Sequence, residues 1–286
     1  LILLILVAAL VVLGVGGSWY SRWLARQWGE DAARATPAVT HADGRDYVPT
    51  PTPVVFAHHF ASIAGAGPII GPVIALCFGW LPGLLWILFG GTLLGALHDY
   101  LATFISLRSG GRSLAAVARE ELGAGPFLAM AGFLVLVLAL VCATFLNLSA
   151  AALVSMVPHA RLALPAGQHW FRCVGSGAEQ QVVIGGIAST SVIVITMLAP
   201  LVGWLYLRRR APVWQCSLLA MVICAVSIAA GLNWPVTLSA TVWKLTLAGY
   251  VLIAAGLPVW IFLQSRDFIN VHLLYAGLAA LVAMLL

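Results

Sequence analysis

Long apolar runs alternate with short polar segments along this chain. Several runs exceed the roughly 20 residues that a helix needs to cross the hydrocarbon core of a bilayer. The pattern predicts about eight membrane spans, at Leu1–Ser18, Pro53–Gly79, Leu84–Leu107, Pro126–Val157, Val182–Leu207, Val213–Gly231, Val242–Gln264 and Ile269–Leu286. The connections include a polar loop at Arg26–Thr52, a short amphipathic element at Arg108–Leu122 and a second loop at Pro158–Gln180.

The second span is predicted to be a broken helix. Gly65 and Gly67 each cost about 1 kcal/mol relative to alanine in a helix, and Pro68 removes a backbone donor. Pro72 adds a second proline one turn later. Irregular backbone at membrane depth is tolerated only where protein covers it or where it lines a wet cavity. The stretch 64–68 is therefore expected to border a binding site.

A second interruption is expected five spans later, at Gly256-Leu257-Pro258 in the seventh span. Two broken helices of opposite direction, five spans apart, are typical of an inverted five-helix repeat in secondary transporters. The alternative is that glycine and proline are simply frequent in membrane helices. On the first interpretation, residues 1–28 form a first membrane helix and 29–52 a cytoplasmic loop. Residues 53–232 form the first repeat, and 233–286 begin a second, inverted repeat that we expect to be truncated.

Composition places the chain among polytopic all-α membrane proteins. Of its 286 residues, 62% are hydrophobic and 8% are charged, whereas soluble domains carry about 25% charged residues. The formal charge of +5 does not indicate nucleic acid, because the basic residues fall between the apolar runs. Placing Arg208–Arg210 in the cytoplasm puts most other arginines there as well, as the positive-inside rule expects, and places the N-terminus outside.

Several segments resemble the carbon starvation protein A family. They are DGRDYVPT (43–50), AHHFASIAGAGPIIGPVIA (57–75), GWLPGLLWI (79–87), HDY (98–100), GGRSL (110–114) and LPVWIFLQSRDFIN (257–270). The chain departs from the family pattern at Ala57, where glycine is common, and at Ser265, where proline is common. The resemblance implies a carrier in the bacterial inner membrane, associated with the uptake of peptides and pyruvate, with a LeuT-like inverted repeat.

The candidate substrate site is the backbone of the first break. Unpaired N–H groups and half-helix ends suit an anionic group such as a carboxylate. The predicted substrate-binding residues are His58, Ser62, Ala64, Gly65, Ala66, Gly67, Pro68 and Gly256. A nucleotide-phosphate loop is not indicated, because the glycines do not match GxGxxG and no βαβ context exists.

Candidate ion or proton sites are His58 and Asp99, since ionisable groups inside membranes are often functional. Each could instead be structural: His58 as a hydrogen-bonding residue, and Asp99 as a partner of Arg108 or Arg266. His59 points about 100° away from His58 on a helix and is expected to pack elsewhere. A zinc site from His58, His59, His98 and Asp99 would match no common spacing, so no metal is predicted. Arg266-Asp267 is expected to be a turn that caps and anchors the last span.

Hydroxyl and amide side chains within two spans are expected to link helices rather than bind substrate. They are Thr144, Asn147, Ser149, Thr190 and Ser191.

The leading functional hypothesis is a secondary active transporter for a small carboxylate-bearing nutrient, pyruvate or short peptides. Its partners would be that substrate, a coupling proton or sodium ion, and membrane lipid, with no cofactor and no nucleic acid. The second hypothesis is a truncated relative that serves as a structural subunit of a larger membrane complex. An enzyme is not expected, because no nucleophile and base are spaced recognisably.

Overall fold

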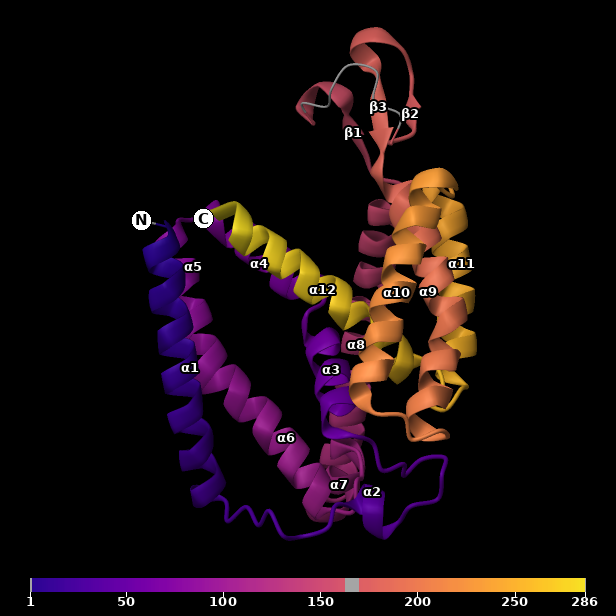
Figure 1. The fold of residues 1–286 in the computed structure, drawn as a ribbon. Coiled ribbons are helices and arrows are strands. Elements are labelled where there is room, and N and C mark those ends of the chain that lie inside the picture. Colours follow the sequence, from indigo (N-terminus) through magenta and orange to yellow (C-terminus); the bar gives the residue numbers. More distant parts are fainter. Residues whose placement is uncertain (1, 163–169, 286) are drawn as a thin grey trace. The chain divides into compact units, whose positions relative to one another are not determined.

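The computed structural model describes residues 2–162 and 170–285, which fold mainly into helices (Figure 1). They form two compact units. The first comprises Leu1–Pro49, Ala66–Leu138 and Ala280–Leu286, and the second comprises Thr50–Gly65 and Ala139–Ala279.

The all-α membrane class is confirmed. Six helices of the described residues are long and apolar enough to cross a bilayer: Ile2–Gln27, Trp80–Arg108, Ala124–Leu153, Ile184–Leu207, Val213–Asn233 and Leu263–Met284. A shorter apolar helix is α11 (Ala240–Ala255), and two other short helices are α3 (Thr52–Ile63) and α4 (Ala66–Leu76). The predicted total of eight spans is reached only if α3 and α4 together form one broken span and α11 forms another. The number of spans therefore stays a prediction.

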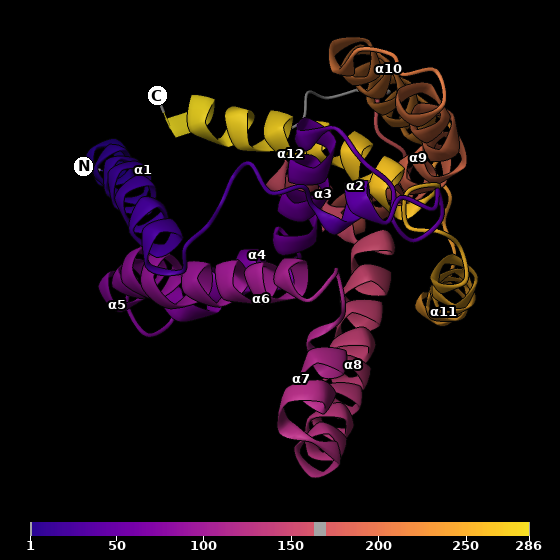
Figure 2. The same cartoon turned by 90° about the horizontal axis from the view of Figure 1, so that it is seen from below.

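The first unit is built around two long helical rods. One is α1 (Ile2–Gln27), which continues past Ser18 because no glycine or proline occurs before Gly29. The other runs through α5 (Trp80–Leu85), the π-helical η1 (Trp86–Gly95) and α6 (Ala96–Arg108). Figure 2 shows α1 beside the α5 end of this rod. The Tyr20 hydroxyl donates a hydrogen bond to the Leu93 carbonyl at 3.1 Å, which links the two rods.

The loop after α1 contains a tight turn centred on Asp43. Its Oδ1 accepts hydrogen bonds from the backbone N–H groups of Arg45, Asp46 and Tyr47, each at 2.8 Å. Gly44 has φ of +74°, a conformation that glycine adopts without strain. The turn presents Tyr47, whose hydroxyl donates to the Gly110 carbonyl at 2.9 Å. The segments 43–50 and 110–114 are thus in direct contact.

The remaining helices of this part of the chain are short or shared between the units. Helix α2 spans Pro37–Thr40, and α7 spans Leu114–Leu122. Ser113 caps α7 by accepting a hydrogen bond from the Ala116 N–H. Helix α8 (Ala124–Leu153) begins in the first unit and continues in the second.

The second unit contains a small antiparallel sheet where only a loop was expected. Its strands are β1 (Met156–Pro158), β2 (Cys173–Val174) and β3 (Gln181–Val183), in the order β1-β3-β2. The register pairs Met156 with Val183 and Cys173 with Val182. Two 3-10 turns, η2 (His159–Arg161) and η3 (Gly177–Glu179), lie between strands. Residues 163–169 of the predicted loop lie outside the described residues.

The packed core of the second unit surrounds the hairpin of α9 (Ile184–Leu207) and α10 (Val213–Asn233), which lie side by side in Figure 1. Ser191 and Ser227 share a buried hydrogen bond of 2.7 Å between these helices. Thr190 donates to the Trp234 carbonyl at 2.7 Å. Both α9 residues therefore link elements, as predicted. Thr144 and Asn147 instead bond carbonyls of their own helix, so that prediction was wrong for them.

The predicted end of the seventh span is corrected by the structure. Helix α11 stops at Ala255, residues 256–262 form turns, and α12 spans Leu263–Leu285. Pro258 cannot continue a helix, and its ring disfavours helical geometry in the preceding residue. The second interruption therefore connects two helices rather than dividing one span. Arg266 and Asp267, expected in a turn before the last span, lie in the first turns of α12.

Candidate functional site

The first predicted break is present between α3 and α4. Helix α3 ends at Ile63 and α4 begins at Ala66, with Ala64 and Gly65 between them. Gly67 and Pro68 fall in the first turn of α4, where a missing N–H costs no helical hydrogen bond. Pro72 lies inside α4. The interruption is thus narrower than the predicted 64–68.

Gly65 lies close to an aromatic ring of the second unit. A Cβ at this position would be 3.6 Å from Cζ of Phe145 on α8, whereas one at Gly67 would meet open space. One turn before the break, the Ser62 hydroxyl donates to the His58 carbonyl at 2.7 Å. Gly256 ends α11, and its N–H donates to the Ile253 carbonyl. The substrate role of these residues stays a prediction.

His58 is held against α12. Helix α3 buries Val54 and Ala57 in the core of the second unit, and this packing turns His58 toward α12. Its Nδ1 lies 2.8 Å from Oδ2 of Asp267, with side chains 32% and 13% exposed. The neighbouring His59 is exposed. The two adjacent histidines therefore occupy different environments, and of these two only His58 has an acidic partner among the described residues.

Two further side chains extend this pair. Arg266 Nη2 lies 3.1 Å from Oδ1 of Asp267, and Arg266 Nη1 donates to the Tyr250 hydroxyl at 2.8 Å. We refer to His58, Tyr250, Arg266 and Asp267 as the His58 cluster. It joins α3, α11 and α12, and it combines one carboxylate, one guanidinium and one imidazole. The carboxylate of Asp267 thus has both of its oxygens in contact, one with the guanidinium and one with the imidazole.

Sequence reasoning found His58 but missed its partners. His58 and Asp267 are 209 residues apart, and no local pattern connects them. The available signal was the Arg266-Asp267 pair itself, because two ionised residues beside an apolar run are costly unless they are paired. On sequence alone, that pair is interpreted as a local cap and anchor.

Asp99 lies in a different setting from the one expected. Its Oδ1 is 3.2 Å from Nδ1 of His98, and the two side chains are 51% and 79% exposed. Arg108, a predicted partner of Asp99, donates instead to the Gly29 carbonyl at 2.7 Å and stacks over Phe104. The expected Asp99–Arg108 pair is therefore absent from the described contacts. A role of Asp99 in ion coupling stays a prediction.

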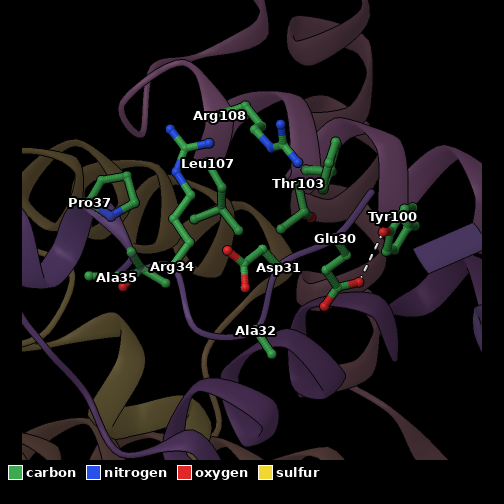
Figure 3. Close-up of a pocket in the computed structure, with 12 residues that line it drawn as sticks. Glu30, Asp31, Ala32, Arg34, Ala35, Pro37, Tyr100, Thr103, Leu107 and Arg108 are labelled. Atoms are coloured by element: carbon green, nitrogen blue, oxygen red, sulfur yellow. Dashed lines mark hydrogen bonds between the residues drawn. The ribbon is translucent and has the colours of Figure 1, made fainter. Parts of the chain in front are cut away.

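A pocket of about 400 Å³ lies where the loop after α1 meets α6 (Figure 3). Four charged side chains border it, two acidic and two basic: Glu30, Asp31, Arg34 and Arg108. The Tyr100 hydroxyl donates to Glu30 Oε2 at 3.0 Å, so the last residue of the HDY motif anchors this loop. None of the predicted site residues lines this pocket.

Within the described parts of the chain, no group of three or more histidine, cysteine or acidic residues is arranged to hold a metal ion.

The apolar helices and the partly buried ionised cluster define a multi-pass α-helical membrane protein. The chain belongs to the carbon starvation protein CstA family, whose model matches residues 2–286. It is 34% identical to the peptide transporter CstA of Campylobacter jejuni over 284 residues, and 33% identical to the peptide transporter CstA of Escherichia coli over 282 residues. It is also 35% identical to the pyruvate/proton symporter BtsT of Escherichia coli over 280 residues.

These alignments cover 94% of the chain but only 36%, 36% and 35% of the respective relatives. The chain thus spans just over a third of the length of these proteins. No solved structure matches it significantly.

Proposed function

We propose that this protein is a secondary active transporter that takes up a small carboxylate-bearing nutrient, pyruvate or a short peptide, by alternating access. The observation that carries the proposal is the 33–35% identity, along 94% of the chain, to two peptide transporters and a pyruvate/proton symporter. The second hypothesis, a structural subunit, gains no support, because these relatives are named as transporters.

The proposed substrate site is the break between α3 and α4, with His58, Ser62, Ala64, Gly65, Ala66, Gly67, Pro68 and Gly256 as its residues. Two findings support a special role for this region: the helix is interrupted there, and His58, about two turns before Gly65, contacts the carboxylate of Asp267. Half-helix ends attract charged groups, and carboxylates suit the N-terminal end. Pyruvate and peptide C-termini both carry a carboxylate.

The membrane arrangement is part of the proposal. We infer a bacterial inner-membrane location, an outside N-terminus, a LeuT-like inverted repeat and coupling to a proton or sodium gradient through His58 and Asp99. The arginine distribution supports the orientation, and the α3–α4 break supports the repeat.

Transport by the purified full-length protein in liposomes tests this function. Uptake of labelled pyruvate and of dipeptides would be measured with a pH gradient, with a sodium gradient and with neither. We expect gradient-dependent accumulation of at least one substrate. Absence of uptake for both classes, by protein shown to be folded, would contradict the proposal.

Leucine substitutions test the site. We expect Gly65→Leu and Gly67→Leu to abolish uptake while expression stays intact, because a branched side chain would occupy the space beside the broken backbone. Gly132→Leu on α8 is the control matched to Gly67→Leu, because a Cβ at either position meets open space. Uptake by Gly132→Leu should stay normal. Normal uptake by Gly67→Leu would argue against the site.

A further inference from the structure

The His58 cluster contains a carboxylate that is already neutralised by its neighbour. Arg266 and Asp267 are adjacent on α12, and Nη2 of Arg266 lies 3.1 Å from Oδ1 of Asp267. Their charges therefore cancel without a contribution from any residue of α3. Nevertheless, the second oxygen of Asp267 contacts His58 at 2.8 Å. A cap or anchor would not need a titratable partner from another helix. The contact therefore indicates that the imidazole has a role other than anchoring α12.

The geometry assigns the two imidazole nitrogens different tasks. An ionised carboxylate only accepts hydrogen bonds, so Nδ1 of His58 must carry the hydrogen that it donates to Asp267. In neutral His58 the lone pair is then on Nε2. A proton binds by forming the Nε2–H bond and leaves by breaking it, while the Nδ1 contact persists in both states. The His58 side chain is 32% exposed, so the packed core does not enclose it.

We propose that Nε2 of His58 carries the transported proton, and that Asp267, Arg266 and Tyr250 are positioning residues that set the charge of the cluster. This inference rests on the proposed transport function and makes that function more specific. With neutral His58 the cluster has no net charge, and with protonated His58 it has one positive charge. A substrate carboxylate is attracted only in the second state, so proton and anion bind together.

The other titratable groups near His58 have different contacts. On α3, His59 is exposed. On α12, His272 is within hydrogen-bond distance of the Phe268 carbonyl, and the Tyr275 ring packs on Phe60. In the core beside Val54 and Ala57, Tyr206 shares a hydrogen bond with Ser265, and Cys224 donates to the Ile269 carbonyl. Cys216 lies buried in the same core.

The test is proton-driven uptake of labelled pyruvate and of a dipeptide in liposomes containing the full-length protein. For one-to-one symport, an inward gradient of about one pH unit supports about tenfold accumulation, the factor that corresponds to 1.4 kcal/mol. We expect the wild type to show this pH-driven gain. In His58→Gln the ratio of uptake with and without the gradient should fall to about one, with slow downhill uptake remaining. His59→Gln is the matched control and should keep the gain.

The positioning residues are tested by the pH profile of uptake. Asp267→Asn removes the negative charge and leaves Arg266 beside His58, so protonation becomes harder and half-maximal uptake should move to lower pH. Asp267→Glu should restore the profile in part. Arg266→Gln leaves Asp267 unopposed and should move half-maximal uptake to higher pH. A merely structural role would lower uptake at every pH without moving the profile.

Several results would overturn the inference while leaving the transport function intact. They are an undiminished pH-driven gain in His58→Gln, an equal loss in His59→Gln, unchanged profiles in both α12 variants, or wild-type uptake driven by sodium alone. Wild-type protein that transports neither substrate would instead contradict the proposed function. If His58→Gln does not fold, the inference is tested by the pH of half-maximal uptake in the other two variants. This pH should be lower in Asp267→Asn and higher in Arg266→Gln, and unchanged values would overturn the inference.

Discussion

Glycine residues permit the closest helix contacts in the second unit. A Cβ on Gly231 of α10 would lie 2.5 Å from the Ile187 carbonyl oxygen on α9, and a Cβ on Gly185 would lie 2.5 Å from the Leu153 carbonyl. Neither backbone group can rotate away as a flexible side chain could. In membranes, where helices gain little from hydrophobic burial, such close backbone approach is a main source of association.

We therefore expect Gly231→Ala to destabilise the protein. Overpacking costs about 1–3 kcal/mol, which exceeds the gain of about 0.5–1 kcal/mol from replacing a helical glycine by alanine. The apparent melting temperature of the detergent-purified protein should fall. Gly249→Ala on α11 is the control, because a Cβ there meets open space, and its melting temperature should stay level or rise. Equal melting temperatures for both variants would contradict the packing described here.

Asp43 provides a prediction about pH. Hydrogen bonds from the backbone N–H groups of Tyr47 and Arg45 lower the pKa of its carboxyl below the usual value. A lowered pKa means that the turn is favoured while the group is ionised. This contribution is complete above the ordinary value of about 3.9 and is lost as the pH falls through the lowered pKa.

Amide hydrogen exchange over residues 43–47 checks this prediction. Protection, corrected for intrinsic exchange rates, should be constant at neutral pH and should disappear only below about pH 4. Asp43→Ala should remove it at every pH. Asp46→Ala is the control, because Asp46 contributes only its backbone N–H to the turn. Loss of protection near pH 6 would show that another group controls the turn.

At the scale of elements, polar links between α9, α10 and the segment after α10 hold the hairpin in register. Ser191 in the first half of α9 meets Ser227 in the second half of α10, and Thr190 accepts a hydrogen bond from the Val236 N–H while donating to the Trp234 carbonyl. These groups are buried among apolar side chains, where an unmade hydrogen bond is costly.

A double-mutant cycle of Ser191→Ala and Ser227→Ala measures this link. We expect a coupling free energy of about 0.6–1.7 kcal/mol, the range found for hydrogen bonds between membrane helices. Unfolding in detergent with a chemical denaturant provides the free energies. Thr144→Ala is the matched control, since Thr144 is exposed and bonds its own helix. A coupling near zero would mean that the two hydroxyls act independently.

The connection between α11 and α12 shows how an element boundary changes an interpretation. Starting α12 at Leu263 rather than Ile269 moves Arg266 and Asp267 from a turn into a helix. There they share a helix with Ile269 and Val271, which pack into the core. The pair is thereby positioned by packing and not by the membrane surface alone.

At the scale of the whole molecule, orientation in the membrane follows from charge. Helix α9 separates the small sheet from Arg208–Arg210, so these two segments must lie on opposite sides if α9 crosses the bilayer. The positive-inside rule places the arginines in the cytoplasm.

Cysteine labelling tests this arrangement. In full-length protein without native cysteines, Ser176→Cys should react with an impermeant maleimide added to intact cells. Arg208→Cys should react only after the membrane is made permeable. Both positions are exposed, so access depends on the side of the membrane. Labelling of position 208 in intact cells would show that the predicted topology is wrong and that this segment lies outside.

Much of this architecture could be predicted from sequence because it depends on local properties. A run of apolar residues selects a membrane helix wherever it occurs, and the glycine and proline near Gly65 interrupt that helix through backbone energetics alone. The break is narrower than expected because Pro68 is accommodated in the first turn of α4. The small sheet was missed because its strands are only two or three residues long.

The candidate site depended on information that no local pattern contains. The sequence determined that His58 is an ionisable residue on an apolar helix, about two turns before a break and on the same face as Ser62 and Gly65. Only the tertiary structure decided that its partner is Asp267, 209 residues away, and that Asp99 lies exposed beside His98. Helix formation follows from neighbouring residues, whereas ion pairing follows from which helices pack together. That packing is a property of the folded chain as a whole.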